Sequence, residues 1–228
     1  ELAGSSYSTL KQQGFWLVVS LLLCFFMAKT DYNVWYRFRW WMYGLTTLGL
    51  VLCFVPFLSE SVNGASRWVS LKKMGMGWAH IQPSEFAKIA AAVLLAGWYA
   101  RFEPQTGEFK AGFLIPGLLS VVVIGLIGAE VDLGNSALIA AMSFSVMFVA
   151  GVRLKFLLPL VAGAIGSLIL VVKMMPNRVL RIMAFLDLEK HKEDFGLQQW
   201  RALFSFGSGG WFGMGLGYGR QKYGYLPE

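Results

Sequence analysis

The chain has 228 residues, of which 56% are hydrophobic and 14% are charged, and its formal net charge is +7. Because soluble domains carry about 25% charged residues, this composition argues against a soluble protein and favours a membrane protein. In a membrane protein, an excess of Lys and Arg indicates cytoplasmic loops and contact with anionic lipid, and it does not indicate nucleic-acid binding. Cys24 and Cys53 lie in apolar runs without metal-ligand or redox spacing, so we expect both to be buried thiols.

Six apolar segments follow one another along the chain, and a membrane-spanning helix needs about 17–25 such residues. They run from Leu10 to Ala28, Trp40 to Leu58, Phe86 to Ala100, Ala111 to Ala129, Ser136 to Val152 and Phe156 to Val172. The third is short unless it begins near Gln82 and includes Glu85 and Lys88. An open sheet would leave backbone groups unsatisfied in lipid. We therefore predict an all-α fold, a polytopic helical membrane bundle with six spans within residues 10–172.

Basic residues mark the connections that follow the first, third and fifth segments. They are Lys29, Arg37 and Arg39, then Arg101 and Lys110, then Arg153 and Lys155. The positive-inside rule places the connections 29–39, 101–110 and 153–155 in the cytoplasm. Residues 59–81 then face outward, and 173–228 form a large extracytoplasmic loop of the same membrane domain, which spans residues 1–228.

In the outward loop 59–81, an Asn63-Gly64 turn signal precedes the pair Arg67-Trp68. Trp and Arg both favour the depth of the membrane interface, so the pair is explained as an interfacial anchor. Alternatively, the planar guanidinium of Arg67 suits a phosphate group, which predicts an anion-binding residue.

The third segment opens with Gln82-Pro83-Ser84-Glu85, and Pro83 fits the first helical turn, where its missing N–H costs nothing. Glu85 suits the dipole near a helix N-terminus, and Lys88 shares its face three residues later. Two charges entering a membrane helix are costly unless they pair or line a cavity. The pair is therefore either an ion pair that fixes the helix or the border of a polar cleft that positions a ligand.

The fourth and fifth segments are joined with almost no polar loop, so Asp132 lies at or within the membrane edge. Asp132 is either the N-cap of the next helix, for which Gly134 and Asn135 are competing caps, or a carboxylate that pairs with a cation or serves function.

The long segment 173–228 contains a mixed-charge run at 187–194, which is typical of a solvated helix or loop. His191 has no partner at metal-ligand spacing, and we predict no metal site. Residues 207–224 include eight glycines and cannot form a stable membrane helix. Such a backbone either cradles phosphate through its N–H groups or is simply a flexible loop, and it matches neither the P-loop nor the Rossmann pattern.

Taken in chain order, six motifs resemble the SEDS family, the polytopic peptidoglycan glycosyltransferases FtsW and RodA. They are Asn-Gly-x-x-Arg-Trp at 63–68, Gln-Pro-Ser-Glu-x-x-Lys at 82–88, Asp-Leu-Gly at 132–134, Arg-x-x-Arg-Ile at 178–182, Gly-Ser-Gly-Gly at 207–210 and Gly-Leu-Gly-x-Gly-x-Gln-Lys-x-x-Tyr-Leu-Pro-Glu at 215–228. The resemblance covers nearly the whole chain, and the last motif looks more like FtsW than RodA. It implies that the chain, which starts at Glu1, is an internal fragment lacking the first and last helices.

The resemblance implies an enzyme of the bacterial cytoplasmic membrane that polymerises lipid II and releases undecaprenyl pyrophosphate, in cell division or shape maintenance. It implies lipid II, membrane lipid and a class B penicillin-binding protein as partners. A divalent cation would assist at the pyrophosphate, although no metal-ligand spacing requires one, and no other cofactor is expected.

The resemblance also assigns support roles to matched positions, which are Arg67, Trp68, Glu85, Lys88, Asp132, Arg181 and Lys222. Arg181 and Lys222 are expected to contact the pyrophosphate, whereas Glu85 and Lys88 are expected to face the central cavity. The family's favoured catalytic base, an aspartate, would lie shortly beyond Glu228, so no catalytic residue is assigned here and the fragment alone is expected to be inactive.

The chain departs from the family pattern around Asp132, where Val131 replaces the usual Pro and Asn135 replaces the usual Thr. Intramembrane charges are also compatible with a lipid-linked precursor flippase or another transporter. A non-catalytic scaffold for division proteins is a further alternative.

Overall fold

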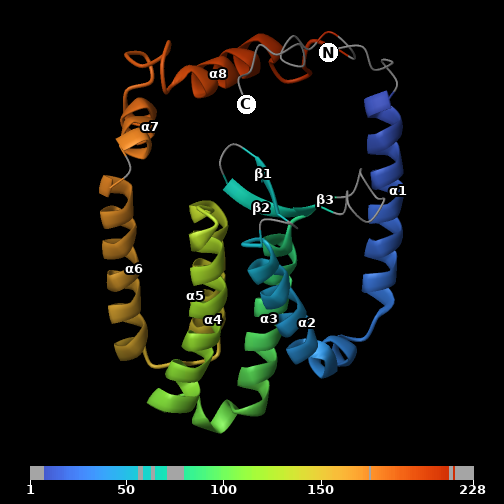
Figure 1. The fold of residues 1–228 in the computed structure, drawn as a ribbon, viewed down its shortest axis with the longest axis vertical. Helices are drawn as coiled ribbons and strands as arrows, with labels where there is room; N and C mark the ends of the chain where they lie inside the picture. Colours follow the sequence, from blue (N-terminus) through green and yellow to red (C-terminus); the bar gives the residue numbers. More distant parts are fainter. Residues whose placement is uncertain are drawn as a thin grey trace. The chain divides into compact units, whose positions relative to one another are not determined.

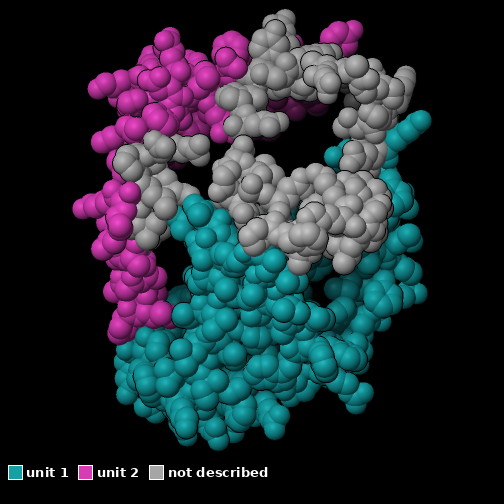
Figure 2. Space-filling model, in the orientation of Figure 1, with its two compact units in different colours: residues 1–157 teal, residues 158–228 magenta. Residues whose placement is uncertain are grey.

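The computed structural model describes residues 8–55, 59–62, 65–70, 80–174, 176–215 and 218. It contains two compact units, residues 1–157 and 158–228 (Figure 2). The first contains α1 (Ser8–Lys29), α2 (Tyr32–Leu52), β1 (Ser59–Val62), β2 (Ala65–Ser70), β3 (His80–Ile81), α3 (Pro83–Arg101), α4 (Ile115–Ala129) and α5 (Leu133–Val149). α6 (Leu154–Met174) begins in the first unit and continues into the second, which also holds α7 (Pro176–Leu186) and α8 (Leu197–Gly209).

A helix lies at each of the six predicted apolar segments, which confirms the helical class. Among the described residues, one helix, Phe109–Ala129, is by itself long and apolar enough to cross a membrane. Gln13–Lys29 and Tyr32–Leu52 reach that standard as a pair, but the chain bends by 113° between them. Leu133–Val149 and Leu154–Ser167 are apolar but shorter. The count of six spans therefore stays a prediction.

α2 begins at Tyr32, well before the predicted Trp40, because Asp31 caps it. The Asp31 carboxylate accepts hydrogen bonds from the backbone N–H of Asn33 at 3.0 Å and from the Asn33 side chain. These bonds hold the pKa of the Asp31 carboxyl below its usual value, the backbone bond having the larger effect. The first turns of α2 contain Asn and Arg residues, which lower the hydropathy there and explain why the prediction began the segment later. The N-cap and the interspersed aromatic residues stabilise the helix in this stretch.

The loop 59–81 is a departure from the all-α prediction, because part of it forms a three-stranded antiparallel sheet in the order β1-β2-β3. Val62 pairs with Ala65 at the end of the β1–β2 ladder, and the predicted turn residues Asn63 and Gly64 lie outside the described residues. A bulge interrupts the register between Glu60 and Ser61. β3 leads directly into α3, which begins at Pro83 as predicted.

The helices α2, α3, α4 and α5 lie side by side and form the core of the first unit (Figure 1). One buried cluster consists of Leu50, Ala87, Ala91, Val123, Ile127 and Ile139, and a second consists of Tyr99, Met147, Val152 and Leu157. The small side chains of Ala87 and Ala91 allow close packing between helices, which is one source of helix association inside a bilayer. At Gly49, a Cβ would lie 3.1 Å from Cβ of Pro83, so α2 and α3 approach closely at this position.

The start of α4 is fastened to the end of α3 by two side chains. Residues Phe109–Leu114 form a π-helical turn, in which Trp98 Nε1 donates to the Ala111 carbonyl at 2.9 Å and Tyr99 Oη donates to the Gly112 carbonyl at 2.7 Å. A Cβ at Gly112 would overlap the Thr106 carbonyl oxygen, so only glycine fits there.

α1 exposes most of its described apolar side chains, including Leu22 at 65% and Phe26 at 62%. The prediction that Cys24 is buried is therefore wrong, whereas Cys53 is buried as expected. An apolar run does not by itself mean protein burial, because lipid can cover such a helix instead.

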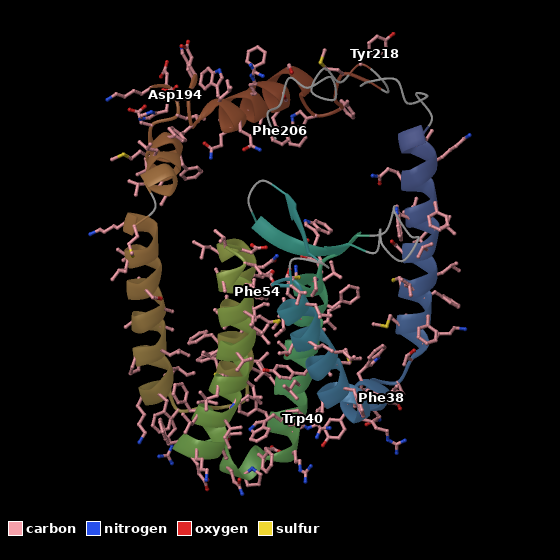
Figure 3. All side chains as sticks on the ribbon, in the orientation of Figure 1. Phe38, Trp40, Phe54, Asp194, Phe206 and Tyr218 are labelled. Carbon is pink, nitrogen blue, oxygen red and sulfur yellow. The ribbon has the colours of Figure 1, made fainter. Side chains whose placement is uncertain are left out.

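In the second unit, Ala184 of α7 is buried, while Phe185 and Leu186 are exposed at 72% and 79%. Gly196 closes the turn before α8, where a Cβ would lie 2.8 Å from the His191 carbonyl oxygen. α8 exposes Phe204 and Phe206, and Figure 3 marks Phe206 on this helix.

Candidate functional site

The first turns of α3 and α5 meet in a polar cluster formed by Ser84, Glu85, Lys88, Asp132 and Asn135, called here the Lys88–Asp132 cluster. Ser84 and Lys88 of α3 both contact Asn135 of α5, which brings the two helix N-termini together. Each N-terminus carries a partial positive charge from its free backbone N–H groups. The cluster therefore lies where two helix dipoles favour negative charge.

Lys88 lies at the centre of this cluster. Its Nζ is 2.8 Å from Glu85 Oε1 in an ion pair and donates to Asn135 Oδ1 at 3.4 Å. The Lys88 side chain is 23% exposed, and that of Glu85 is 54% exposed. The ion pair that the sequence offered as one interpretation is therefore present, whereas a ligand-positioning role for the two charges stays a prediction.

Asp132 lies on the other side of Asn135 and is 9% exposed. Its carboxylate accepts from the Asn135 backbone N–H at 3.2 Å and from Asn135 Nδ2 at 2.9 Å. Asp132 is thus the N-cap of α5, ahead of the alternatives Gly134 and Asn135. The same Nδ2 lies 3.5 Å from Oγ of the fully buried Ser84, so Asn135 contacts Ser84, Lys88 and Asp132.

The position of Asp132 depends on an unusual backbone conformation of the residue before it. Val131 has φ of 63°, a left-handed conformation that is rare for a β-branched residue. The N–H of Val131 donates to the Gly128 carbonyl at 3.0 Å, and the N–H of Asp132 donates to the Ile127 carbonyl at 3.3 Å. This pair of bonds is a Schellman motif, whose left-handed position is usually Gly.

A second buried acid lies close by in the sequence. Glu130 ends α4, is 3% exposed and lies beside the buried thiol of Cys53 at the end of α2. Sequence reasoning singled out neither Glu130 nor the bridging role of Asn135. The spacing of Asn135, three residues after a capping Asp, was the available signal for its role.

The other predicted site residues are placed less fully. Trp68 is half-buried on β2, a strand that contacts α3, whereas Arg67 is described only as part of the β2 backbone. Arg181 belongs to α7 in the second unit, its side chain is outside the described part, and Lys222 lies outside the described residues. Within the described ranges, no group of three or more His, Cys, Asp or Glu could hold a metal ion.

The Lys88 ammonium retains hydrogen-bonding capacity within the cluster. A lysine ammonium carries three N–H donors, and the contacts with Glu85 and Asn135 account for two of them. Lys88 is also partly exposed beside two helix N-termini, a position that favours negative charge.

The fold is a bundle of largely apolar helices with a charged cluster where α3 and α5 begin. The family model described as "cell cycle protein", which covers FtsW, RodA and SpoVE, matches residues 1–228. The chain belongs to this family of integral membrane proteins, as its motifs predicted.

Curated relatives include proteins named probable peptidoglycan glycosyltransferase FtsW. The protein from Legionella pneumophila is 34% identical over 217 residues, and that from Coxiella burnetii is 33% identical over 213 residues. These matches cover 95% and 93% of this chain but 54% and 56% of the relatives. The chain thus spans about half the length of the curated relatives it matches.

Two solved structures share the fold. One belongs to a study of structural coordination of polymerization and crosslinking by a peptidoglycan synthase complex, with a TM-score of 0.67 and 25% identity over 89% of this chain and 57% of that chain. The other is the rod shape determining protein RodA of Thermus thermophilus, with a TM-score of 0.59 and 28% identity over 71% of this chain and 50% of that chain.

Proposed function

We propose that the whole protein is a peptidoglycan glycosyltransferase of the FtsW type, which polymerises lipid II and releases undecaprenyl pyrophosphate. The family match and the FtsW relatives support this activity. The structural observation that carries it is the placement of Lys88 between Glu85 and Asn135, at the meeting point of two helix N-termini. This arrangement suits the pyrophosphate of a lipid-linked sugar.

In the proposed reaction, a base removes the proton of the acceptor hydroxyl and its oxygen bonds to the anomeric carbon of the donor sugar. The bond from that carbon to the pyrophosphate oxygen breaks, and the pyrophosphate leaves with the electron pair. Lys88 stabilises the charge that develops on this leaving group. By the family resemblance, the base is an aspartate located after Glu228. The same resemblance assigns supporting contacts to Arg67, Arg181 and Lys222.

We place the protein in the bacterial cytoplasmic membrane with six spans in this chain. In this arrangement, 29–39, 101–110 and 153–155 are cytoplasmic and 173–228 are extracytoplasmic. Lys29 ends α1, Arg101 ends α3 and Arg153 lies between α5 and α6, which is the charge distribution that the positive-inside rule favours. A class B penicillin-binding protein is the proposed partner, in line with the described coordination of polymerization and crosslinking in the related complex.

The test compares the whole protein and residues 1–228, each purified with the partner and given lipid II. We expect glycan chains from the whole protein and none from residues 1–228, because the expected base is absent from them. Polymer formation by residues 1–228 would show that the base lies within this chain.

A flippase assay on the same preparation separates the rival function. Lipid II in proteoliposomes should stay in its leaflet while polymer forms. Transport of lipid II without any polymer, under conditions where a related polymerase is active, would replace the glycosyltransferase by a transporter.

A further inference from the structure

A groove lies between the start of α2 and the end of α3, at the opposite end of α3 from Lys88. It is lined by Tyr32, Asn33 and Tyr36 of α2 and by Ala96, Gly97 and Ala100 of α3, with a volume of about 520 Å³. Small-molecule sites typically enclose about 300–1,000 Å³. The proposed glycosyltransferase reaction makes no use of this groove.

Arg39 is 8% exposed and packs against Tyr36, one of the residues that line the groove. Its Nη1 donates to the Tyr36 carbonyl at 2.6 Å, and its guanidinium carbon lies 4.0 Å from the centre of the Tyr36 ring. A Cβ at Gly97 would lie 2.7 Å from Cδ of Arg39. Arg39 therefore holds the Tyr36 wall, and the absence of a side chain at Gly97 makes room for it.

Two exposed arginines lie one helical turn beyond residues that line the groove. Arg37 follows the lining residue Asn33 by four positions, and Arg101 follows Gly97 by four positions, so each shares the face of a lining residue. Asp31, the acid at the start of α2, is bound by Asn33. Exposed aromatic side chains surround this end of α2, including Tyr32 at 78%, Phe38 at 50% and Trp40 at 46%, the last two labelled in Figure 3. Aromatic and basic residues together are typical of the headgroup region of a membrane.

We propose that this groove binds an acyl chain of an anionic phospholipid, whose phosphate lies against Arg37 and Arg101. The small Ala96 and Ala100 and the Tyr36 ring suit a flexible hydrocarbon chain. A transmembrane helix fits less well, because the ends of such helices on the basic side of a membrane carry Lys and Arg themselves and would be repelled. The site requires that the helices lie in a membrane, and it does not depend on the reaction that the protein catalyses.

The test measures lipid retention by the whole protein in native mass spectrometry, with phosphatidylglycerol and phosphatidylcholine of identical acyl chains as probes. We expect preferential retention of phosphatidylglycerol. Arg37→Gln and Arg101→Gln should each weaken that retention about fivefold, since one basic residue near an anionic surface contributes about a factor of five. Ala96→Phe, which fills the groove, should weaken retention of both lipids.

Matched controls are Lys155→Gln, an exposed cation that does not line the groove, and Ala141→Phe, the same enlargement at an exposed position of α5. Both should retain lipid as the unaltered protein does. Equal retention of the two lipids, or unchanged retention in the two arginine variants, would overturn the proposal, and these variants decide it even if Ala96→Phe fails to fold. A photo-crosslinking residue at Ala100 should capture phospholipid in cells, and capture of a protein helix instead would equally overturn it.

Discussion

At the scale of single residues, Asn135 links the Glu85–Lys88 ion pair to Asp132. Its amide oxygen accepts from Lys88, and its amide nitrogen donates to Asp132 and reaches Ser84. The sequence allowed the pairing of Glu85 with Lys88 to be predicted, because their spacing fixes them on one helix face. It did not reveal that Asp132 joins them, because that contact depends on how α3 packs against α5.

Asn135→Ala should lower the free energy of unfolding of the whole protein by about 2 kcal/mol, because it removes hydrogen bonds to two charged groups. Asn135→Thr, which restores the residue usual in the resembled family, should recover part of the loss. The measurement is the thermal midpoint in detergent.

Asn33→Ala is the matched control for this pair of variants. Asn33 also binds a capping aspartate, Asp31, but in an exposed position where water replaces the lost bonds. The loss at Asn33 should therefore be clearly smaller than that at Asn135. Equal losses at the two positions would mean that the Asn135 bridge does not hold the cluster together.

At the scale of elements, the turn from α4 to α5 decides where Asp132 points. The Schellman motif there uses Val131 in a left-handed conformation, which costs a residue with a side chain about 1–2 kcal/mol. This local strain is stored next to the capping carboxylate of the Lys88–Asp132 cluster.

Val131→Gly should therefore leave the stability of the whole protein unchanged or raise it by up to about 1 kcal/mol, after the entropy cost of glycine is subtracted. Val122→Gly, in the middle of α4 at a similar exposure of 47% against 42%, should lower it by about 0.5–1 kcal/mol. Thermal midpoints of the two variants check this. A drop at Val131 as large as that at Val122 would contradict a strained Val131.

The apolar segments predicted the helices well, since long hydrophobic runs have few alternatives in lipid. The predicted start of α2 was wrong because polar residues lie in its first turns. The strands β1 and β2 were not predicted, because such short strands carry no strong sequence pattern. The prediction that Cys24 is buried was wrong because sequence hydropathy does not distinguish lipid from protein neighbours.

At the scale of the whole molecule, the first unit has two chemically different ends. The beginnings of α3 and α5 carry the Lys88–Asp132 cluster next to the sheet, while the beginning of α2 and the end of α3 carry Arg37, Arg39 and Arg101 around the groove. This separation agrees with the two proposals made above, a pyrophosphate-linked substrate at the Lys88–Asp132 cluster and an anionic lipid at the groove.

Lys88 gives the most direct test of the central claim, that the Lys88–Asp132 cluster serves lipid II polymerisation. The measurement is the rate of glycan-chain formation by the whole protein with its partner, compared between Lys88→Met and Lys155→Met, with thermal midpoints recorded for both. We expect Lys88→Met to lose about 100-fold in rate, the typical effect of removing a group that stabilises developing charge, and Lys88→Arg to recover part of it. Lys155→Met should remain active. A folded Lys88→Met protein that polymerises lipid II at the unaltered rate would contradict the account.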